Sequence, residues 1–509
     1  MHITELPGHV ATLVIGAGTG GCAFTNIHAT HSTDDILLVE AGPDYGARSS
    51  GCWPADVLDA RSVPLSHDWQ LTGVGSVGCI RDLPRARIIG GCSSHNGCAI
   101  ARSAQADYDD WARCGNPGWD AASVEPLLDW AHAQFRTRHY RMSELTNAQA
   151  AFVRAGIEAG MPSADDLDDM AAAVGIGPMP VNIVNGVRFN AAFAFLDPIR
   201  DLDHVHIAAD TPVQRIVIER GRVAGVALTT SDGQPVVVRA ERVVLAAGAY
   251  HSPALLQRSG VGPADRLRTL GIRSVVNLPG VGEHLLDHAC VQLNFRGKDG
   301  LLAELAQTPW NPDEQSVGRA RSSRCDNGPY DMHVFMVAGA NSGHPGLPLI
   351  SLYGAAMRAK SEGRVTITAA DGTIAVDHRY GTDPDGHDLA VLGEALSLLE
   401  EMITRPQLAA ILGKHLRAKY PPTANIASYC HPAGTCAMGP ESDPAAVVDA
   451  TGQVHGVADL HVADASIMPA ITRANINLPT AMIGARIATQ LLKVAPRAAA
   501  AIPASPAAN

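Results

Sequence analysis

The sequence predicts a mixed α/β (α+β) fold that contains a Rossmann-like dinucleotide-binding unit. Residues 10–15 and 36–39 are unbroken apolar runs, and the segment between them is long enough for one crossover helix. Continuous apolar strands joined by a helix are typical of parallel βαβ units that are buried on both faces. Short runs rich in Val and Ile alternate with turn residues between about 204 and 239. This second pattern predicts a small antiparallel sheet inserted into the α/β unit.

A glycine fingerprint follows the first predicted strand. The run GAGTGG places Gly16, Gly18 and Gly21 in the pattern G-x-G-x-x-G, and Glu40 ends the next strand. The first glycine allows a tight turn, the second lets a pyrophosphate approach the backbone, and the third lets helix and strand pack closely. The helix N-terminus stabilises phosphate charge, and Glu40 is placed to accept hydrogen bonds from ribose hydroxyls. The motif alone does not distinguish FAD from NAD.

Composition and charge limit the classes of function. A chain of 509 residues is expected to form about two or three structural units. The formal net charge is −12 and no long block of Lys or Arg occurs, so we expect neither nucleic acid nor an anionic membrane surface as a partner. No apolar run approaches the ~18–20 residues of a membrane span. The N-terminus MHITELPGHV lacks the pattern of a secretory signal, so we expect a cytoplasmic protein.

The cysteines and the acidic and histidine residues predict no metal. The 10 cysteines include no Cys-x-x-Cys pair, and their spacing suggests neither a zinc site nor a disulfide framework. No cluster of His, Asp and Glu has convincing ligand spacing. No G-x-S-x-G motif occurs either, so the sequence does not support a serine nucleophile.

Five further stretches resemble the glucose–methanol–choline (GMC) oxidoreductase family and occur in the family's order. They are residues 87–97 (RIIGGCSSHNG), 248–262 (GAYHSP through SGVG), 279–288 (PGVG through DH), 431–435 (HPAGT) and 462–480 (VADAS through NINLPT). With the fingerprint they span residues 10 to about 490. The resemblance implies a Rossmann-like FAD-binding domain, a substrate domain built on an antiparallel sheet, bound FAD, and oxidation of an alcohol to an aldehyde or ketone.

The resemblance and the local patterns together predict how the chain is divided. We expect an FAD-binding domain at 1–300, with the small inserted sheet at about 204–239, and a substrate-binding domain at 301–425. Residues 426–493 are expected to return to the FAD domain with the catalytic residues, and the low-complexity tail 494–509 to be disordered. Within the substrate domain, 306–330 has the composition of a loop and 389–403 has helical leucine spacing.

His431 and Asn475 match the family's catalytic positions. Oxidising an alcohol removes a proton from oxygen and a hydride from carbon, and the resemblance assigns the hydride to flavin N5. An imidazole with a pKa near about 6.5 suits the role of proton acceptor at neutral pH. An Asn amide can donate a hydrogen bond to the oxygen on which negative charge develops. The resemblance therefore implies a His–Asn catalytic pair.

The resemblance to the family also implies which residues contact FAD. The loop at 87–97 is most similar to that of the choline oxidase branch, in which the motif's histidine carries the flavin covalently, and this position falls on His95. Asp464 matches a position that hydrogen-bonds the ribityl or phosphate region, and a helix beginning at Pro479 would direct its N-terminus at the flavin pyrimidine. The residues predicted to contact FAD are Gly16, Gly18, Thr19, Gly20, Gly21, Glu40, Gly91, Cys92, His95, Asn96, Gly97, Val213, Asp464, Ala465 and Asn477.

The substrate and the electron acceptor stay open at this point. Choline needs a cage of aromatic rings, but Cys430 stands where choline oxidases have an aromatic residue before the catalytic histidine, and aromatic content is only 5%. Both facts argue against choline. The acceptor is either dioxygen or, in a dehydrogenase, a quinone or mycofactocin-type carrier. Two further alternatives keep the fold and FAD: a photodecarboxylase, which the intact His–Asn pair argues against, and a hydroxynitrile lyase, whose flavin no alcohol would reduce.

Overall fold

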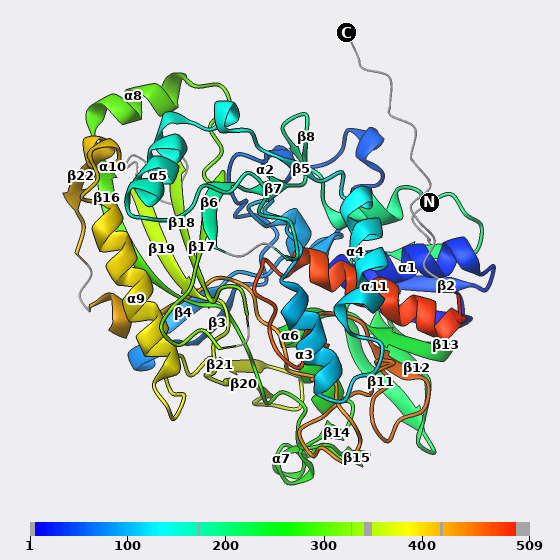
Figure 1. The fold of residues 1–509 in the computed structure, drawn as a ribbon. Coiled ribbons are helices and arrows are strands. Elements are labelled where there is room, and N and C mark those ends of the chain that lie inside the picture. Colours follow the sequence, from blue (N-terminus) through cyan, green and yellow to red (C-terminus); the bar gives the residue numbers. More distant parts are fainter. Residues whose placement is uncertain (1–5, 172–173, 327, 340–348, 418–420, 495–509) are drawn as a thin grey trace.

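The computed structural model contains two seven-stranded sheets in different halves of the molecule (Figure 1). One sheet is built mainly from parallel pairs and follows the glycine fingerprint, whereas the other is antiparallel. This arrangement confirms the predicted combination of an α/β unit with an antiparallel substrate sheet. The structure describes residues 6–171, 174–326, 328–339, 349–417 and 421–494.

The first sheet is built around the predicted βαβ unit. Strands β1 (His9–Ile15) and β2 (Ile36–Val39) pair in parallel and are joined by α1 (Thr19–His31). All four side chains of β2 are buried, which is why this strand has no polar residues. The strand order is β10-β2-β1-β13-β12-β11, and β24 lies beside β13. These further strands are β10 (Val205–Ala208), β11 (Val213–Glu219), β12 (Arg222–Thr229), β13 (Pro235–Leu245) and β24 (Leu460–Val462).

The strands predicted at 204–239 exist, but they do not form a separate inserted sheet. β10 pairs in parallel with β2, so it extends the main sheet. β13 is one long strand whose first half pairs antiparallel with β12 and whose second half pairs parallel with β1. The polar residues Arg239 and Glu241, where the predicted small sheet ends, are exposed positions of this strand that alternate with the buried Ala240.

The C-terminal helix packs closely against the first turn of α1. Helix α11 (Asn477–Leu492) lies beside α1 (Figure 1), and a Cβ placed on Gly484 would lie 2.1 Å from the carbonyl oxygen of Gly20. Only glycine permits this approach, which holds the C-terminal segment beside the fingerprint. The sequence predicted a helix that begins at Pro479. The structure shows that α11 begins at Asn477, so Pro479 is its third residue. The first four N–H groups of a helix have no intrahelical partner, and proline therefore costs nothing there.

The second sheet contains only antiparallel pairs. Its order is β22-β16-β19-β18-β17-β6, and β23 pairs with β16. Helices α5 (Asn147–Glu158) and α9 (His387–Met402) cover one face (Figure 1), and α9 confirms the helix predicted at 389–403. The strands are β6 (Gly175–Pro178), β16 (Ala289–Gly297), β17 (Ser316–Ala320), β18 (Met332–Gly339), β19 (Leu349–Ala356), β22 (Leu412–His415) and β23 (Ala427–Ser428).

Two expectations for the middle of the chain need correction. The loop predicted at 306–330 is wrong in part, because it contains β17, a short strand whose Gly and Arg residues hid the β pattern. The substrate sheet also takes β6 and β16 from before residue 301, so a division at residue 300 does not separate the two sheets. Of the tail predicted at 494–509, all but residue 494 lies outside the described residues.

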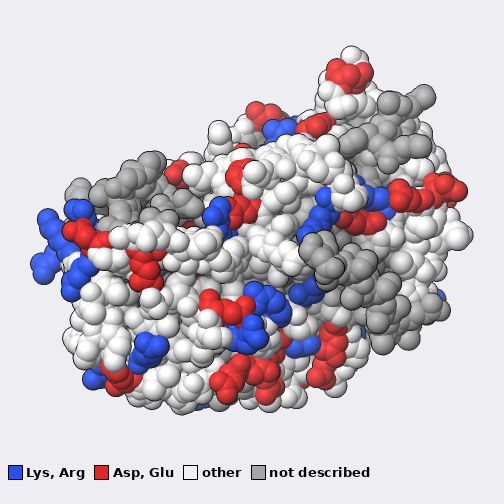
Figure 2. All heavy atoms as spheres, turned by 90° about the horizontal axis from the view of Figure 1, so that it is seen from above, with Lys and Arg blue, Asp and Glu red and all other residues white. Residues whose placement is uncertain are grey.

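The helices and one face of the surface can be compared with what a membrane-crossing helix and a single-sign charged surface would require. Within the part of the chain that the structure describes, no helix is both long enough and apolar enough to cross a bilayer. On the face seen in Figure 2, basic and acidic side chains are interspersed, with no large area of one sign.

Candidate active site

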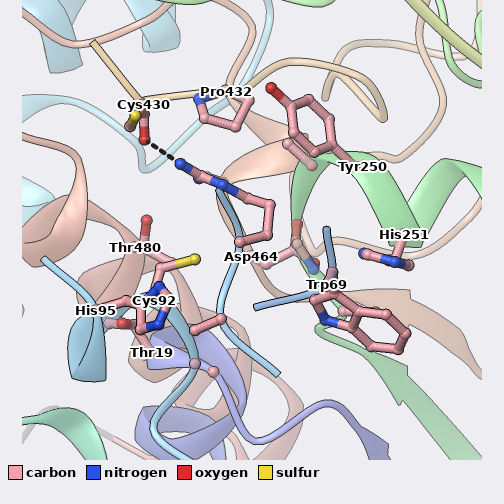
Figure 3. Close-up of a pocket in the computed structure, with 18 of the residues that line it drawn as sticks. Thr19, Trp69, Cys92, His95, Tyr250, His251, Cys430, Pro432, Asp464 and Thr480 are labelled. Atoms are coloured by element: carbon pink, nitrogen blue, oxygen red, sulfur yellow. Dashed lines mark hydrogen bonds between the residues drawn. The ribbon is translucent and has the colours of Figure 1, made fainter. Parts of the chain in front are cut away.

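One cavity of about 570 Å³ connects the glycine fingerprint with the predicted catalytic pair. Gly16 and Thr19 line one part of it, and His431 and Asn475 line another. Strands of both sheets contribute, since Ile15 ends β1 and Phe335 belongs to β18. In Figure 3, Thr19, His95 and Cys92 lie together on one side, and Cys430 and Pro432 face them across the cavity.

The structure brings almost all the predicted FAD contacts into this cavity. The exception is Gly21, where a Cβ would lie 2.0 Å from the carbonyl oxygen of Gly16, so this glycine serves the close packing predicted for it. The residues that line the cavity as predicted are Gly16, Gly18, Thr19, Gly20, Glu40, Gly91, Cys92, His95, Asn96, Gly97, Val213, Asp464, Ala465 and Asn477.

Glu40 and Asn477 offer unused hydrogen-bonding capacity to a dinucleotide. Glu40 is 7% exposed and accepts the backbone N–H groups of Ala17 and Gly42, each at 2.9 Å. Burial raises its pKa to about 7. These two bonds leave acceptor positions on the carboxylate for ribose hydroxyls. Asn477 accepts from the hydroxyl of Thr19 at 2.7 Å, while its buried Nδ2 has no partner among the described residues. Both features fit a bound FAD.

Asp464 is engaged by the protein itself. Its carboxylate accepts Gly248 N at 2.8 Å, Ser252 Oγ at 2.6 Å and Ser466 N at 2.8 Å. It therefore holds the N-terminus of α6 (Gly248–Arg258) at the cavity wall. The predicted hydrogen bond from this carboxylate to the ribityl or phosphate region stays a prediction.

His95 is held in one neutral tautomer. Its Nε2 contacts the carbonyl oxygen of Ser66, and burial lowers its pKa. A carbonyl oxygen can only accept, so Nε2 carries the hydrogen and the lone pair is on Nδ1. A neutral imidazole with a free lone pair is the form that covalent attachment to a flavin requires.

The predicted catalytic residues lie together, and two further residues fix their protonation. Asn475 Nδ2 is 3.4 Å from His431 Nε2, and His431 Nδ1 is 2.9 Å from His288 Nδ1. His288 Nε2 is 2.9 Å from the carbonyl oxygen of Thr472. Because this carbonyl only accepts, His288 donates from Nε2 and accepts at Nδ1. His431 therefore donates from Nδ1, which leaves its lone pair on Nε2, beside Asn475.

The electrostatic surroundings keep His431 uncharged. Burial holds the pKa of His431 well below its usual value of 6.5, and the neighbouring His288 and the positive charge of Arg85 lower it further. Arg85 also lines the cavity and donates from Nη2 to the carbonyl oxygen of Cys430 at 3.0 Å (dashed in Figure 3). The backbone N–H of His431 donates to Asp287 at 3.0 Å. His431 is thus held in place as a neutral base at neutral pH.

An aromatic wall adjoins the catalytic histidine. The ring of Tyr429 lies 4.5 Å from that of His431, centroid to centroid, and stacks on Phe335 at 4.4 Å. Phe335 also stacks on Tyr353 at 4.8 Å. We use "aromatic wall" for Phe335, Tyr353 and Tyr429, all of which line the cavity.

Sequence reasoning missed most of this wall and several polar neighbours. Phe335 and Tyr353 are directly paired across β18 and β19, a register that no local pattern reveals. His288 ends the stretch 279–288 that resembles the family, but the resemblance assigns it no role, and Arg85 and Glu314 lie outside the matching stretches. All three depend on contacts between distant segments.

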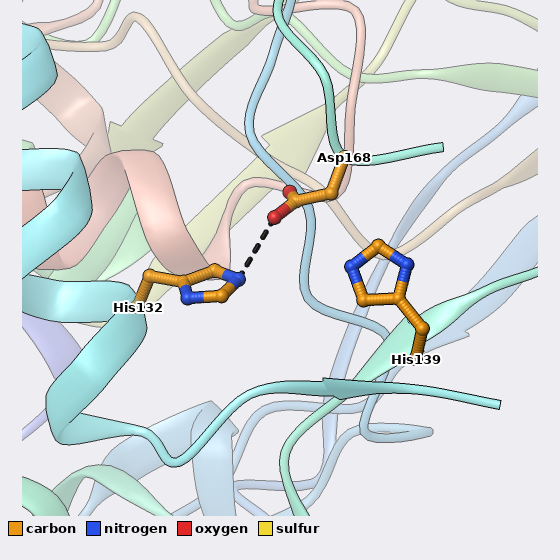
Figure 4. A group of neighbouring side chains, drawn as sticks. All are labelled: His132, His139 and Asp168. Atoms are coloured by element: carbon orange, nitrogen blue, oxygen red, sulfur yellow. Dashed lines mark ion pairs between the residues drawn. The ribbon is translucent and has the colours of Figure 1, made fainter. Parts of the chain in front are cut away.

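A second group of histidines lies outside the cavity. His132, at the end of α4 (Ala121–Gln134), contacts Asp168 at 2.8 Å, and His139 of β5 (Arg138–His139) lies nearby (Figure 4). The same carboxylate oxygen accepts from Arg102 Nη1 at 2.5 Å. The guanidinium already satisfies this carboxylate and opposes a dication, so we interpret the group as an ion-pair network. The expectation that the chain holds no metal stays a prediction.

Comparison with known proteins places this geometry in a family. Two family models, both described as GMC oxidoreductase, match residues 10–290 and 359–484. The chain is 31% identical to the oxygen-dependent choline dehydrogenase of Paraburkholderia phymatum, over 96% of this chain and 94% of that protein. It is 28% identical to the mitochondrial choline dehydrogenase of Homo sapiens, over 94% of this chain and 88% of that protein.

Solved structures share the fold. Pyridoxine 4-oxidase of Mesorbium loti superposes with a TM-score of 0.82 at 24% identity, over 94% of this chain and 99% of that one. A fungal aryl-alcohol oxidase superposes with a TM-score of 0.79 at 18% identity, over 96% and 99%. The family models cover the fingerprint, the flavin loop and the catalytic motif, and the relatives favour neither a lyase nor a photodecarboxylase. The chain therefore belongs to the GMC oxidoreductase family and is an FAD-dependent enzyme that oxidises an alcohol.

Proposed function

We propose that His431 and Asn475 are the catalytic residues of this alcohol oxidation. The observation that carries the proposal is the single cavity that contains both residues and the dinucleotide fingerprint. Bound FAD supplies the hydride acceptor, at N5 of its ring system. His431 Nε2 takes the hydroxyl proton, because its lone pair is the one left free by the bond to His288. The 3.4 Å separation of His431 Nε2 and Asn475 Nδ2 lets one substrate oxygen contact both.

Each residue has a distinct electrostatic role in the proposal. His431 becomes positive when it takes the proton, and His288 Nδ1 then accepts a charge-assisted hydrogen bond. Asn475 donates to the oxygen as negative charge develops on it. The uncharged state of His431, which its lowered pKa ensures, makes the base available before the alcohol binds.

Residues along the cavity are proposed to hold FAD. Gly18 and the N-terminus of α1 would bind the pyrophosphate, and Glu40 the ribose of the adenosine. Asn477 Nδ2, buried and without a partner in the described part of the chain, would donate to the cofactor. We also propose a covalent bond between FAD and His95, supported by the neutral tautomer that Ser66 imposes.

We propose dioxygen as the electron acceptor. The relative from Paraburkholderia phymatum is an oxygen-dependent choline dehydrogenase, and Arg85 contributes a positive charge to the cavity of this chain. Positive charge near a reduced flavin favours the negatively charged species that form as oxygen is reduced. Reoxidation of the alcohol-reduced enzyme on admission of air tests this step, and slow recovery of the flavin absorbance would point to a carrier instead.

Anaerobic flavin reduction by a panel of alcohols tests the catalytic assignment. We expect His431→Ala to retain FAD and to slow reduction by roughly 10²-fold or more, the size typical of a lost general base. Asn475→Ala should slow it by about 10²-fold through the lost oxyanion donor. His206→Ala, a histidine outside the cavity lining, is the control. Fast reduction in His431→Ala would assign the base to another residue.

A further inference from the structure

Three buried side chains outside the active-site cavity carry hydrogen-bond donors that the protein itself does not use. They are Arg319 of β17, His333 of β18 and Tyr330, which precedes β18. None is more than 2% exposed, and none lines the cavity that contains the catalytic pair. Arg319 Nε, the Tyr330 hydroxyl and both ring nitrogens of His333 have no hydrogen-bond partner among the residues that the structure describes. Leaving a buried donor unpaired is costly, so a group of them indicates a bound water or ion.

These three side chains lie against one another. Arg319 and His333 are direct partners across β17 and β18, so their side chains share one face of the sheet. The guanidinium carbon of Arg319 lies 4.8 Å from the centre of the Tyr330 ring, and this ring stacks on that of His333 with a centroid separation of 5.7 Å. We use "donor cluster" for Arg319, Tyr330 and His333. Because each member contacts the other two, the unused donors belong to one buried group.

The positive charge of Arg319 has no counter-charge in the described part of the chain. No Asp or Glu there forms an ion pair with Arg319, and its Nη2 donates to the carbonyl oxygen of Leu167. Two other buried arginines are satisfied more fully: Arg473 pairs with Asp107, and Arg188 donates from all three of its nitrogens to backbone carbonyl oxygens. Arg319 has one carbonyl acceptor and no carboxylate. A buried guanidinium in this state attracts an anion.

Tyr330 and His333 each offer a hydrogen to such an anion. Burial raises the pKa of Tyr330 to about 12, although the charge of Arg319 opposes the rise, so the phenol keeps its proton. Burial, followed by the charge of Arg319, holds the pKa of His333 well below its usual value, so its ring is neutral and carries one N–H. The charge of Asp107 also reaches Tyr330, but this carboxylate is already paired with Arg473. The donor cluster therefore presents three donors and one positive charge.

We propose that the donor cluster binds one small monovalent anion of the chloride class, which accepts from Arg319 Nε, the Tyr330 hydroxyl and the His333 N–H. A water molecule has two lone pairs, so it would accept from two of these donors and would leave the guanidinium uncompensated. An anion accepts from all three and also neutralises the charge. A monovalent anion matches the single guanidinium, and the low exposure of all three side chains favours a small ion.

The donor cluster adjoins the catalytic histidine through the aromatic wall. The ring of His333 lies 6.4 Å from that of Tyr429, which also packs against His431. His431 becomes positive when it takes the alcohol proton, and an anion at the donor cluster lowers the electrostatic cost of that charge. Removal of the anion should therefore slow flavin reduction by roughly two- to ten-fold. This kinetic effect rests on the proposed function, whereas the binding of the anion does not.

Thermal unfolding of the FAD-loaded enzyme tests the binding when chloride replaces the much larger gluconate at constant ionic strength. Chloride should raise the melting temperature of the wild type by roughly 2 °C or more and should saturate, as expected for a ligand that binds only the folded state. Arg319→Met should abolish this shift. Tyr330→Phe keeps the ring and removes one donor, so it should raise the chloride concentration at half-effect by roughly 10-fold, and it decides the question if Arg319→Met does not fold. Arg321→Met is the matched control, because Arg321 is exposed and close in sequence, and it should keep the shift.

Bromide identifies the occupant directly. Crystals of the enzyme grown with bromide should show an anomalous peak within hydrogen-bond distance of Arg319 Nε and the Tyr330 hydroxyl. Density without an anomalous signal at this place would mean that water alone satisfies the donors, and the anion inference would then be wrong while the alcohol oxidation stands. An equal chloride shift in the wild type, Arg319→Met and Tyr330→Phe would overturn the inference in the same way. If the donor cluster binds bromide but no alcohol reduces the flavin, the proposed function is wrong and the anion site stands.

Discussion

At the residue scale, the bond between His288 and His431 decides which nitrogen of the catalytic base is free. His288 is fixed by the Thr472 carbonyl oxygen, so His288→Leu removes the acceptor that holds His431 in its reactive tautomer. The loss of about one hydrogen bond corresponds to roughly 10-fold slower flavin reduction. His288→Gln, whose amide oxygen can accept, should recover part of the rate. Anaerobic stopped-flow reduction measures this, and equal rates in the wild type and both variants would show that His431 orients itself.

The lowered pKa of His431 predicts how the rate of flavin reduction depends on pH. The pKa of His431 is lowered, first by burial and then by His288 and Arg85, so the neutral base is present at and above neutral pH. The rate should stay constant as pH falls toward 6.5 and decline only at more acidic pH, where His431 becomes protonated. Arg85→Met removes a positive charge, so the pKa of His431 should rise and the acidic decline should move to higher pH. A profile that does not move would mean that Arg85 is too well screened to influence the base.

At the scale of elements, helix α3 (Gln105–Arg113) positions the loop that carries Thr472 and Asn475. Asp107 of α3 is fully buried and accepts the backbone N–H of Arg473 at 2.8 Å, and it also contacts the Arg473 guanidinium. This carboxylate fixes the backbone on which the acceptor for His288 and the catalytic amide depend. The positions of the catalytic groups therefore depend on the buried ion pair between Asp107 and Arg473, which does not contact the alcohol.

Asp107→Asn should affect stability and chemistry together. Breaking a buried charge pair costs about 3–5 kcal/mol, so we expect a clear decrease in the denaturant midpoint. The loosened loop should slow flavin reduction at saturating alcohol by about 10-fold. Asp110→Asn, on the same helix but paired with Arg358 and Arg113 farther out, is the control and should change both less. A variant that is destabilised but reduces its flavin at the normal rate would limit Asp107 to a structural role.

At the scale of the whole molecule, the parts that sequence could predict are those with local signals. The βαβ unit, the fingerprint and His431 with Asn475 depend on short motifs, and the structure gathers them in one cavity. Arg85, His288 and the aromatic wall act through contacts between segments distant in the chain, which residue patterns do not encode. The same reason explains β13: whether the strand continues past residue 239 depends on the neighbouring strands with which it pairs.

FAD should control the stability of the whole molecule, because its cavity is lined by both sheets and by the C-terminal segment. If FAD is held only by non-covalent contacts, excess FAD should raise the melting temperature. At a thousand times its Kd, FAD stabilises the folded state by about 4 kcal/mol. If His95 carries it, the melting temperature is independent of added FAD, and the yellow colour stays with acid-precipitated protein. We expect the second behaviour for the wild type and the first for His95→Ala. His251→Ala, another histidine of the cavity, should behave as the wild type. Flavin released into the supernatant by the precipitated wild type would exclude the covalent bond and leave His95 as a neutral hydrogen-bonding residue of the loop.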